Sequence, residues 1–193
     1  PPNFEPEWRG QGMLPENAGF DEYFLWHAGH TEDKGSRYAD PVILDNNGLR
    51  QDTEGKYGPD LYTEYLLDFA KRHQDQPFFI YYPMALTHGP FMPTPDSPGW
   101  IKDRQKSDLK NFKYMVEYTD KIIGRIMEGL DNLGLRDNTL VMFIGDNGSP
   151  TEVVSMLGDR PFRGGKGKST DAGTHVPLVA SWGNNETGTN VCD

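Results

Sequence analysis

Hydrophobic and polar positions follow a helical period in two parts of the chain. Apolar side chains recur on one face between residues 60 and 73, and Asp60 is placed to cap a helix over that segment. A longer apolar stripe predicts a second helix from about residue 109 to residue 133, which Gly134 is positioned to end. The stripe is formed by Phe112, Met115, Val116, Thr119, Ile122, Ile123, Ile126, Leu130 and Leu133. This second segment is the clearest helix that the sequence predicts.

Three short apolar runs predict buried strands. The first, at residues 77–82, follows a helix-breaking stretch and is short and aromatic, which favours a strand over a helix. The other two cover residues 139–144 and 176–182. A proline-rich segment at 83–100 and a glycine-rich segment at 145–173 separate these runs, and both are predicted to be loops.

The order of these elements indicates the fold class. Helix, strand, loop, helix, strand, loop, strand is a βαβ order, so we expect an α/β fold with a mostly parallel, mixed sheet and helices on both faces. We expect one partial domain over residues 1–193, with a loop-rich part at 1–58, an α/β core at 59–182 and a tail at 183–193. The loop-rich part should contain short strands, because its aromatic side chains must be buried somewhere.

Composition and charge narrow the function classes. The chain has 29 acidic and 19 basic residues and a net charge of −10, which argues against a general nucleic-acid binder. An anionic small substrate remains compatible, since a few cations in a pocket are enough to hold one. Cys192 is the single cysteine, so no disulfide forms within the chain. No apolar run approaches the roughly 18–20 residues that a membrane helix needs.

The start of the chain has no feature of a natural N-terminus. It opens at Pro1 without an initiator methionine and without the basic and apolar regions of a signal peptide. We therefore expect an internal part of a longer protein, and the sequence leaves the compartment and the oligomeric state open.

Candidate metal ligands follow the predicted strand at 139–144. Ligand sites in α/β sheets lie beyond the carboxyl ends of the strands, where Asp146-Asn147-Gly148 stands here. A carboxylate and a side-chain amide oxygen are hard ligands that suit Ca²⁺ or Mg²⁺. A plain Asn-Gly turn is the alternative, and for the dipeptide alone it is the commoner case. Two ligands do not fill the shell of such a cation, so others must come from elsewhere.

Two further segments carry candidate anion-binding groups. His88 follows the aromatic run and is suited to donate a proton or to hydrogen-bond an anion, although an isolated loop histidine more often binds a backbone carbonyl. Arg163 and Lys166 stand among glycines that allow close backbone approach to phosphate or sulfate oxygens. The P-loop pattern fails because Phe162 occupies the position of its first glycine. A flexible basic surface loop is the alternative.

The remaining histidines have plainer interpretations. His73 lies at the end of an exposed helix and is expected to be solvated, whereas His27 and His30 lie in an aromatic loop and are expected to be structural.

Together these segments resemble the sulfatase family of the alkaline-phosphatase-like superfamily. The resemblance runs from about residue 15 to residue 182, and its specificity lies in the order and spacing of motifs that are individually weak. The matching segments are residues 19–24, 77–79, 87–91, 118–120, 138–141, 146–148, 163–167 and 175–177.

The resemblance implies roles for particular residues. Asp146 and Asn147 correspond to two ligands of a single divalent cation, usually calcium. Lys166 corresponds to the lysine that contacts the sulfate and leaving-group oxygens, with Arg163 beside it as a further substrate contact. His88 corresponds to the histidine that gives a proton to the leaving alcohol. These roles suit sulfate-ester cleavage, because the charge that develops on the transferring group and the leaving oxygen needs to be neutralised.

The chain also departs from the family pattern. The motif whose cysteine or serine becomes formylglycine is absent, since Cys192 has the wrong context, and the family's N-terminal paired Asp ligands and K-x-H element are absent too. Leu25 stands where glycine is frequent and His175 where arginine is common. We therefore expect the parent protein to carry formylglycine and this chain alone to be inactive.

Two alternatives stay open at this point. A phosphodiesterase or phosphonate hydrolase of the same superfamily would share the fold, but two-metal phosphatases place histidine after the aspartate, where this chain has Asn147. A non-catalytic metal-binding relative is the second alternative. The expected substrate is an aryl or carbohydrate sulfate, and relatives are commonly periplasmic, secreted or lysosomal.

Overall fold

The computed structural model of the chain describes residues 15–26 and 35–183. It divides into two compact units, Pro1–Ile126 and Met127–Asp193, and each is described by itself. Neither unit tests the predicted division into a loop-rich part, a core and a tail, which stays a prediction.

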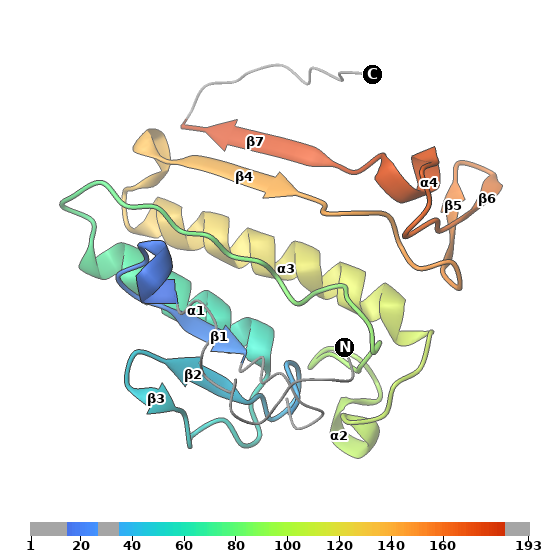
Figure 1. Cartoon of the computed structure of the whole chain (residues 1–193), viewed down its shortest axis with the longest axis horizontal. Helices are drawn as coiled ribbons and strands as arrows, with labels where there is room; N and C mark the ends of the chain where they lie inside the picture. Colours follow the sequence, from blue (N-terminus) through green and yellow to red (C-terminus); the bar gives the residue numbers. More distant parts are fainter. Residues whose placement is uncertain (1–14, 27–34, 184–193) are drawn as a thin grey trace. The chain divides into compact units, whose positions relative to one another are not determined.

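The first unit contains the small sheet that the loop-rich part was expected to hold. A 3₁₀ helix, η2 (Pro15–Ala18), precedes strands β1 (Phe24–Trp26), β2 (Ile43–Asp45) and β3 (Gly48–Leu49). The strands pair antiparallel in the order β1-β2-β3, and β1 contacts helix α1, Gly58–Arg72 (Figure 1).

Helix α1 confirms the first predicted helix but begins two residues earlier. Its N-cap is Tyr57, and Pro59 stands in the first turn, where its fixed φ suits a helix start. The prediction that Asp60 caps the helix is therefore wrong. Asp60 lies inside the first turn, where a negative charge is favourable, and accepts hydrogen bonds from the hydroxyl of Tyr118 and from Arg125.

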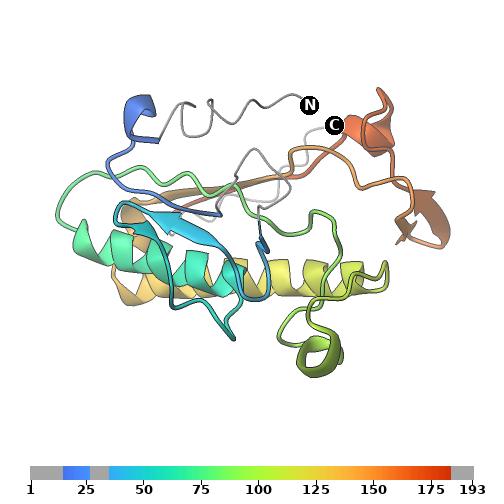
Figure 2. The same ribbon diagram turned by 60° about the horizontal axis from the view of Figure 1, so that its bottom comes forward.

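The long predicted helix is also present. Helix α3 spans Asn111–Asn132, after the short α2 (Trp100–Asp103), and Gly134 follows it with a positive φ of 69°. Helices α1 and α3 lie side by side in both views (Figures 1 and 2), joined through Asp60. Met115, Ile122 and Leu130 are buried, as the stripe predicted, but Val116 is exposed because it lies at the margin of the buried face.

Tyrosines dominate the interior of this unit. The ring of Tyr57 packs edge-on against Trp100 and Tyr118, with centroids 5.3 and 5.1 Å apart, and stacks with Tyr38. Burial raises the pKa of Tyr38, and its hydroxyl donates to the Ala85 carbonyl at 2.7 Å. A buried side chain of the loop-rich part therefore holds the segment that carries His88.

The predicted strand at residues 77–82 is not present. The segment has no strand pairing, and Phe79 and Tyr81 are 73% and 67% exposed instead of buried. The physical reason is that a strand needs a neighbour to satisfy its backbone donors and acceptors, and no described strand supplies one.

The second unit is built on two paired strands. Strand β4 (Leu140–Ile144) and strand β7 (Leu178–Trp182) confirm two of the predicted strands, each slightly shorter than expected, and pair antiparallel with Leu140 opposite Trp182. Short helical turns η3 (Arg136–Asn138) and α4 (Asp171–Thr174) flank them.

A hairpin lies inside the segment that was predicted to be only loop. Strands β5 (Val154–Leu157) and β6 (Arg160–Arg163) pair antiparallel around a tight turn, in which Gly158 has a φ of 60°. A positive φ at the turn suits the twist of a two-residue hairpin connection, and glycine adopts it without a steric cost.

All strand pairs among the described residues are antiparallel. The expected mostly parallel sheet with helices on both faces is not seen in this part of the chain, and several apolar side chains of β4 and β7 are exposed. Of the helices that the structure describes, none has the length and hydropathy to cross a membrane.

Candidate functional site

Strand β4 delivers the two predicted metal ligands to its carboxyl end. Asp146 and Asn147 follow Ile144 after one residue, Gly145, whose N–H donates to the Pro177 carbonyl beside the start of β7 at 2.9 Å. Asp146 is exposed and Asn147 is half-buried. The Asn147 side-chain amide donates to the Asp146 carboxylate, with Nδ2 and Oδ2 2.6 Å apart.

The chemistry of this pair fits a hard divalent cation. The amide oxygen and nitrogen of Asn147 have nearly the same shape, so a half-turn of the side-chain amide places Oδ1 beside the Asp146 carboxylate. Two adjacent oxygen donors are what Ca²⁺ or Mg²⁺ accepts. The described residues contain no group of three or more His, Cys, Asp or Glu side chains that could hold a metal, so the pair supplies only part of a shell.

Three backbone segments meet around these ligands. We call residues 145–149 the metal loop and residues 163–168 the lysine loop; the third segment is α4. The Lys166 N–H donates to Ser149 O at 2.9 Å, which joins the two loops, and the Gly165 N–H donates to Ala172 O at 3.0 Å, which joins the lysine loop to α4. The Gly148 N–H donates to Gly173 O at 3.0 Å and closes a triangle of hydrogen bonds.

Two glycines of the triangle leave no room for a side chain. A Cβ on Gly148 would stand 1.9 Å from Ala172 O, and a Cβ on Gly173 would stand 2.0 Å from Lys168 O. Both distances are far below van der Waals contact, and the obstructing atoms are backbone. The three segments can therefore approach this closely only because these positions are glycine.

Two of the basic residues of the lysine loop, Lys166 and Arg163, differ in their contacts. The Lys166 side chain is exposed while its backbone is fixed to the metal loop. Arg163, the last residue of β6, donates from its guanidinium to Thr151 O at 2.8 Å, which gives it a structural contact within its own unit. The structure therefore places the backbone of Lys166 beside the metal loop, and the roles of both side chains stay predictions.

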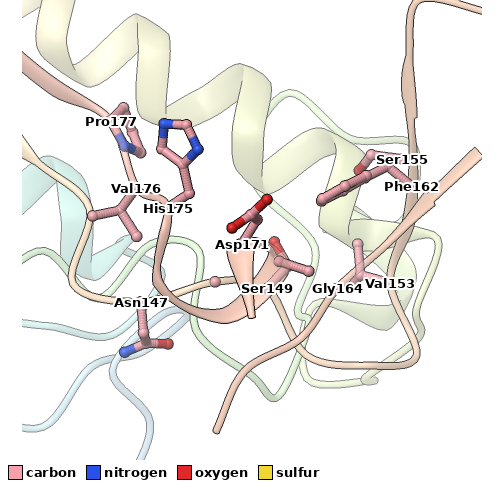
Figure 3. Close-up of a pocket in the computed structure, with 12 residues that line it drawn as sticks. Asn147, Ser149, Val153, Ser155, Phe162, Gly164, Asp171, His175, Val176 and Pro177 are labelled. Carbon is pink, nitrogen blue, oxygen red and sulfur yellow. The ribbon is translucent and has the colours of Figure 1, made fainter. Parts of the chain in front are cut away.

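A cavity of about 200 Å³ opens beside the metal loop (Figure 3). Asn147, Ser149, Ser155, Asp171 and His175 supply polar side chains to its lining, and Ser155 belongs to the β5–β6 hairpin. Figure 3 shows the His175 ring and the Asn147 side chain extending in opposite directions. Asp171 and α4 were missed by the sequence analysis, since a four-residue helix has too few positions to show a period.

His88 lies in the first unit, in the loop that follows residues 77–82. Its Nδ1 is 2.6 Å from Gly89 O, so Nδ1 carries the proton that this carbonyl accepts and Nε2 is the nitrogen left for other partners. Nδ1 therefore has the role of a loop histidine that binds a backbone carbonyl, as the alternative interpretation expected. Nε2 is not used by that contact. The peptide bonds Leu86–Thr87 and Gly89–Pro90 on either side are cis.

Arg37 is a neighbour of His88 that the sequence analysis missed. Its Nη2 donates to Gly89 O at 3.0 Å and lies 3.5 Å from His88 Nδ1. The guanidinium stacks over the ring of Trp26, 4.6 Å from the centroid. Arg37 stands in an irregular segment and approaches His88 across about 50 residues, so no local pattern could have revealed it.

His88 and the other predicted site residues belong to different units. Asp146, Asn147, Arg163 and Lys166 lie in the second unit, where the triangle ties the metal loop to the lysine loop. Their convergence with His88 stays a prediction.

The remaining histidines have mixed outcomes. His73 is not solvated as expected: its Nε2 is 3.0 Å from Oε1 of Glu22 and its Nδ1 is 2.7 Å from the Gln76 side chain, because the end of α1 faces the segment before β1. His27 and His30, like Cys192, lie outside the described residues.

Comparison with known proteins decides the family. A sequence model of the sulfatase family matches residues 3–190, nearly the whole chain. The chain belongs to the sulfatase family. Family membership implies a metal cofactor, which agrees with the hard oxygen donors at the end of β4.

Curated relatives of this sulfatase chain include enzymes of bacteria and mammals. The chain is 32% identical over 133 residues to N-acetylgalactosamine-6-O-sulfatase of Bacteroides thetaiotaomicron, covering 64% of this chain and 25% of the relative. It is 29% identical over 179 residues to the uncharacterized sulfatase YdeN of Escherichia coli, covering 91% and 30%. The sulfatase chain thus spans only about a quarter to a third of these relatives.

A solved structure shares the fold. The crystal structure of Ps i-CgsB superposes with a TM-score of 0.69 at 22% identity, covering 89% of this chain and 41% of that one. The same protein in complex with k-i-k-neocarrahexaose gives a TM-score of 0.66 at 21% identity, covering 89% and 41%. The sulfatase chain therefore has the α/β fold class that the sequence predicted.

Proposed function

We propose that the longer protein expected to carry this chain hydrolyses aryl or carbohydrate sulfate esters with the help of one divalent cation, calcium or else magnesium. The observation that carries the proposal is the bond between Lys166 N–H and Ser149 O. It fixes the backbone of a lysine in the loop next to Asp146 and Asn147, and a metal cation together with a flexible ammonium group is suited to neutralise the charge of a sulfate group.

The chain's own residues divide the work between them. Asp146 and Asn147 hold the cation through their side-chain oxygens, and the bound cation supplies positive charge to the sulfate oxygens. The Lys166 ammonium group, with Arg163 at the end of β6, binds and orients the sulfate. The nucleophile, a formylglycine in this family's pattern, lies outside this chain.

His88 is proposed to deliver the proton that completes the cleavage. When the S–O bond of the ester breaks, its electron pair stays on the leaving alcohol oxygen, which then needs a proton. Because Nδ1–H is directed at Gly89 O, the protonated imidazole presents its second proton on Nε2. Arg37 donates to the same carbonyl and so helps to hold the ring in this orientation.

Carbohydrate sulfates are the favoured substrate class. A relative that shares 32% identity is named N-acetylgalactosamine-6-O-sulfatase, and the solved structure with a similar fold was obtained with a neocarrahexaose. The net charge of −10 argues against a nucleic-acid partner.

We also propose that the longer protein completes the sheet. Exposure alternates along residues 78–81, with Phe79 and Tyr81 facing solvent, which is the pattern of a strand that has no neighbour. Partner strands from outside the described residues would turn this segment into a strand of the mostly parallel, mixed sheet with helices on both faces that the sequence predicts.

A paired assay tests the proposed activity. The longer protein is given an aryl sulfate and the matched aryl phosphate diester, each with calcium and with a chelator. Calcium-dependent cleavage of the sulfate, with little cleavage of the diester, is expected. Preference for the diester would contradict the sulfatase assignment and favour the phosphodiesterase or phosphonate hydrolase alternative.

A matched pair of lysine variants tests the site. Lys166→Ala is expected to lower kcat/KM for the sulfate ester by about 10²-fold or more, because a charge that neutralises the transition state is lost. Lys168→Ala removes an exposed lysine from the same loop and is expected to change kcat/KM by less than about twofold. Equal effects of the two variants would show that the loop contributes only general positive charge.

A further inference from the structure

Helix α4 contacts both loops on which the proposed sulfatase chemistry depends. Its Gly173 carbonyl holds the metal loop through the Gly148 N–H, and its Ala172 carbonyl holds the lysine loop through the Gly165 N–H, both at 3.0 Å. The lysine loop and the metal loop are also joined directly through Lys166 and Ser149. A displacement of α4 therefore cannot be confined to one loop.

Gly173, like Gly148, leaves no space for a side chain in this arrangement. Besides Lys168 O at 2.0 Å, a Cβ there would meet Gly165 O at 2.5 Å, and both oxygens belong to the lysine loop or its edge. The Gly173 N–H donates to Thr170 O at 2.7 Å, so the residue is also fixed within its own turn. Gly173 is buried, and none of the obstructing atoms is the end of a flexible side chain that could move aside.

We propose that Gly173 is a positioning residue: by contacting the metal loop and the lysine loop through its backbone, it sets the distance between the bound cation and Lys166. Gly173 itself has no side chain and touches neither the cation nor the substrate. The proposal rests on the proposed function, because the distance matters only if one anionic group is held from both sides.

The variant Gly173→Ala tests the proposal in the longer protein. The added methyl group pushes the lysine loop away from α4 and shifts the carbonyl that holds the metal loop. We expect the Kd for Ca²⁺, measured by titration calorimetry without substrate, to rise about 10-fold or more, since residues behind metal ligands typically contribute that much. The kcat for the sulfate ester should fall by a similar factor.

Two controls separate positioning from a general loss of stability. Gly183→Ala also forces a Cβ against backbone, 2.7 Å from Asp137 O, at the far end of β7. It should lower the Tm but leave the Kd for Ca²⁺ within about twofold. Lys166→Ala should lower kcat while the Kd stays near that of the unaltered protein. A folded Gly173→Ala protein with unaltered Kd and kcat would overturn the proposal.

Amide hydrogen exchange decides the matter even if Gly173→Ala does not fold. In the unaltered protein, Ca²⁺ should slow exchange in peptides that cover residues 145–150, 163–168 and 171–175 together, because the triangle transmits order from the metal loop. Protection confined to 145–150 would show that the loops move independently, and would overturn the proposal.

Failure of the proposed function has a different signature. It would appear in the unaltered protein, as absence of Ca²⁺ binding or of sulfate-ester hydrolysis. Failure of the Gly173 proposal would appear as full Ca²⁺ binding in the unaltered protein combined with an unaffected variant or with protection restricted to the metal loop.

Discussion

At the scale of single residues, His88 shows how a local contact assigns chemistry to one atom. A loop histidine with no fixed tautomer has two equivalent candidate nitrogens. Here the 2.6 Å contact of Nδ1 with Gly89 O leaves Nε2 as the nitrogen available for the proposed proton transfer. The same contact, which on its own argues for a structural role, thereby strengthens the proposed role as a general acid.

The variant His88→Gln tests that role through the leaving group. An alcohol leaving group of a sugar needs a proton, whereas 4-nitrophenolate leaves without one. We expect kcat to fall about 10²-fold or more for a carbohydrate sulfate and by less than about 10-fold for 4-nitrophenyl sulfate. Equal losses on both substrates, measured in the longer protein, would argue that His88 binds the sulfate and does not protonate the leaving group.

At the scale of elements, Glu22 links the segment before β1 to the end of α1. Its carboxylate accepts two hydrogen bonds from Arg72, at 2.8 and 2.6 Å, and one from the Tyr65 hydroxyl at 3.0 Å. Arg72 is the main cause that lowers the pKa of Glu22 from 4.5 to about 2, and His73 and Tyr65 add to it against the opposing effect of burial.

This link predicts a dependence of stability on pH. A lowered pKa in the folded state means that Glu22 stabilises the protein above about pH 4.5 and loses that contribution as the pH falls towards 2. Glu22→Gln should cost about 1–2 kcal/mol at pH 7, because a charge-assisted pair of hydrogen bonds is lost. The Tm difference from the unaltered protein should narrow below about pH 4.5.

The control for this prediction is Glu16→Gln, which changes an exposed acidic residue of η2. Glu16→Gln should leave the Tm nearly unchanged both at pH 7 and below about pH 4.5. A Tm difference for Glu22→Gln that stays constant with pH would mean that the variant acts through packing and not through charge.

The sequence predicted those helices and strands whose formation depends mainly on residues within the element itself. α1 and α3 were found because a helix satisfies its backbone internally, so an apolar period suffices. The strand at 77–82 was predicted wrongly because an apolar run does not reveal whether a partner strand is present. The β5–β6 hairpin was missed because its strands are four residues each and β6 contains Pro161, which argues against a strand.

The candidate site was predictable to a similar extent. Asp146 and Asn147 could be predicted as candidate oxygen ligands because they follow the end of a predicted strand. The hydrogen-bond triangle could not be predicted from the sequence, because its bonds join backbone groups. Its most constrained residues are glycines, and a pattern of side chains does not indicate where glycines make close backbone contacts. Arg37 was missed for another reason: its contact with His88 depends on how two irregular segments fold together.

At the scale of the whole molecule, we propose that the chain is part of a longer enzyme. The chain spans 25% and 30% of two curated relatives, and the described part of its second unit holds the proposed metal ligands Asp146 and Asn147 and the proposed sulfate-binding Lys166. We expect the purified 193-residue chain to show no turnover of 4-nitrophenyl sulfate with calcium, under conditions in which the longer protein is active. Calcium-dependent turnover by the chain alone would contradict the assignment of the nucleophile to another segment.

The hydrogen-bond triangle has a consequence for how this part of the chain can evolve. Its most distant partners, Gly148 and Gly173, are separated by about 25 residues, and the β5–β6 hairpin lies between them in the sequence. The entropy of closing a loop grows only with the logarithm of its length, so a longer or shorter hairpin costs little. Insertions, deletions and new sequences at the hairpin tip would then alter what surrounds the metal loop while its geometry is inherited unchanged.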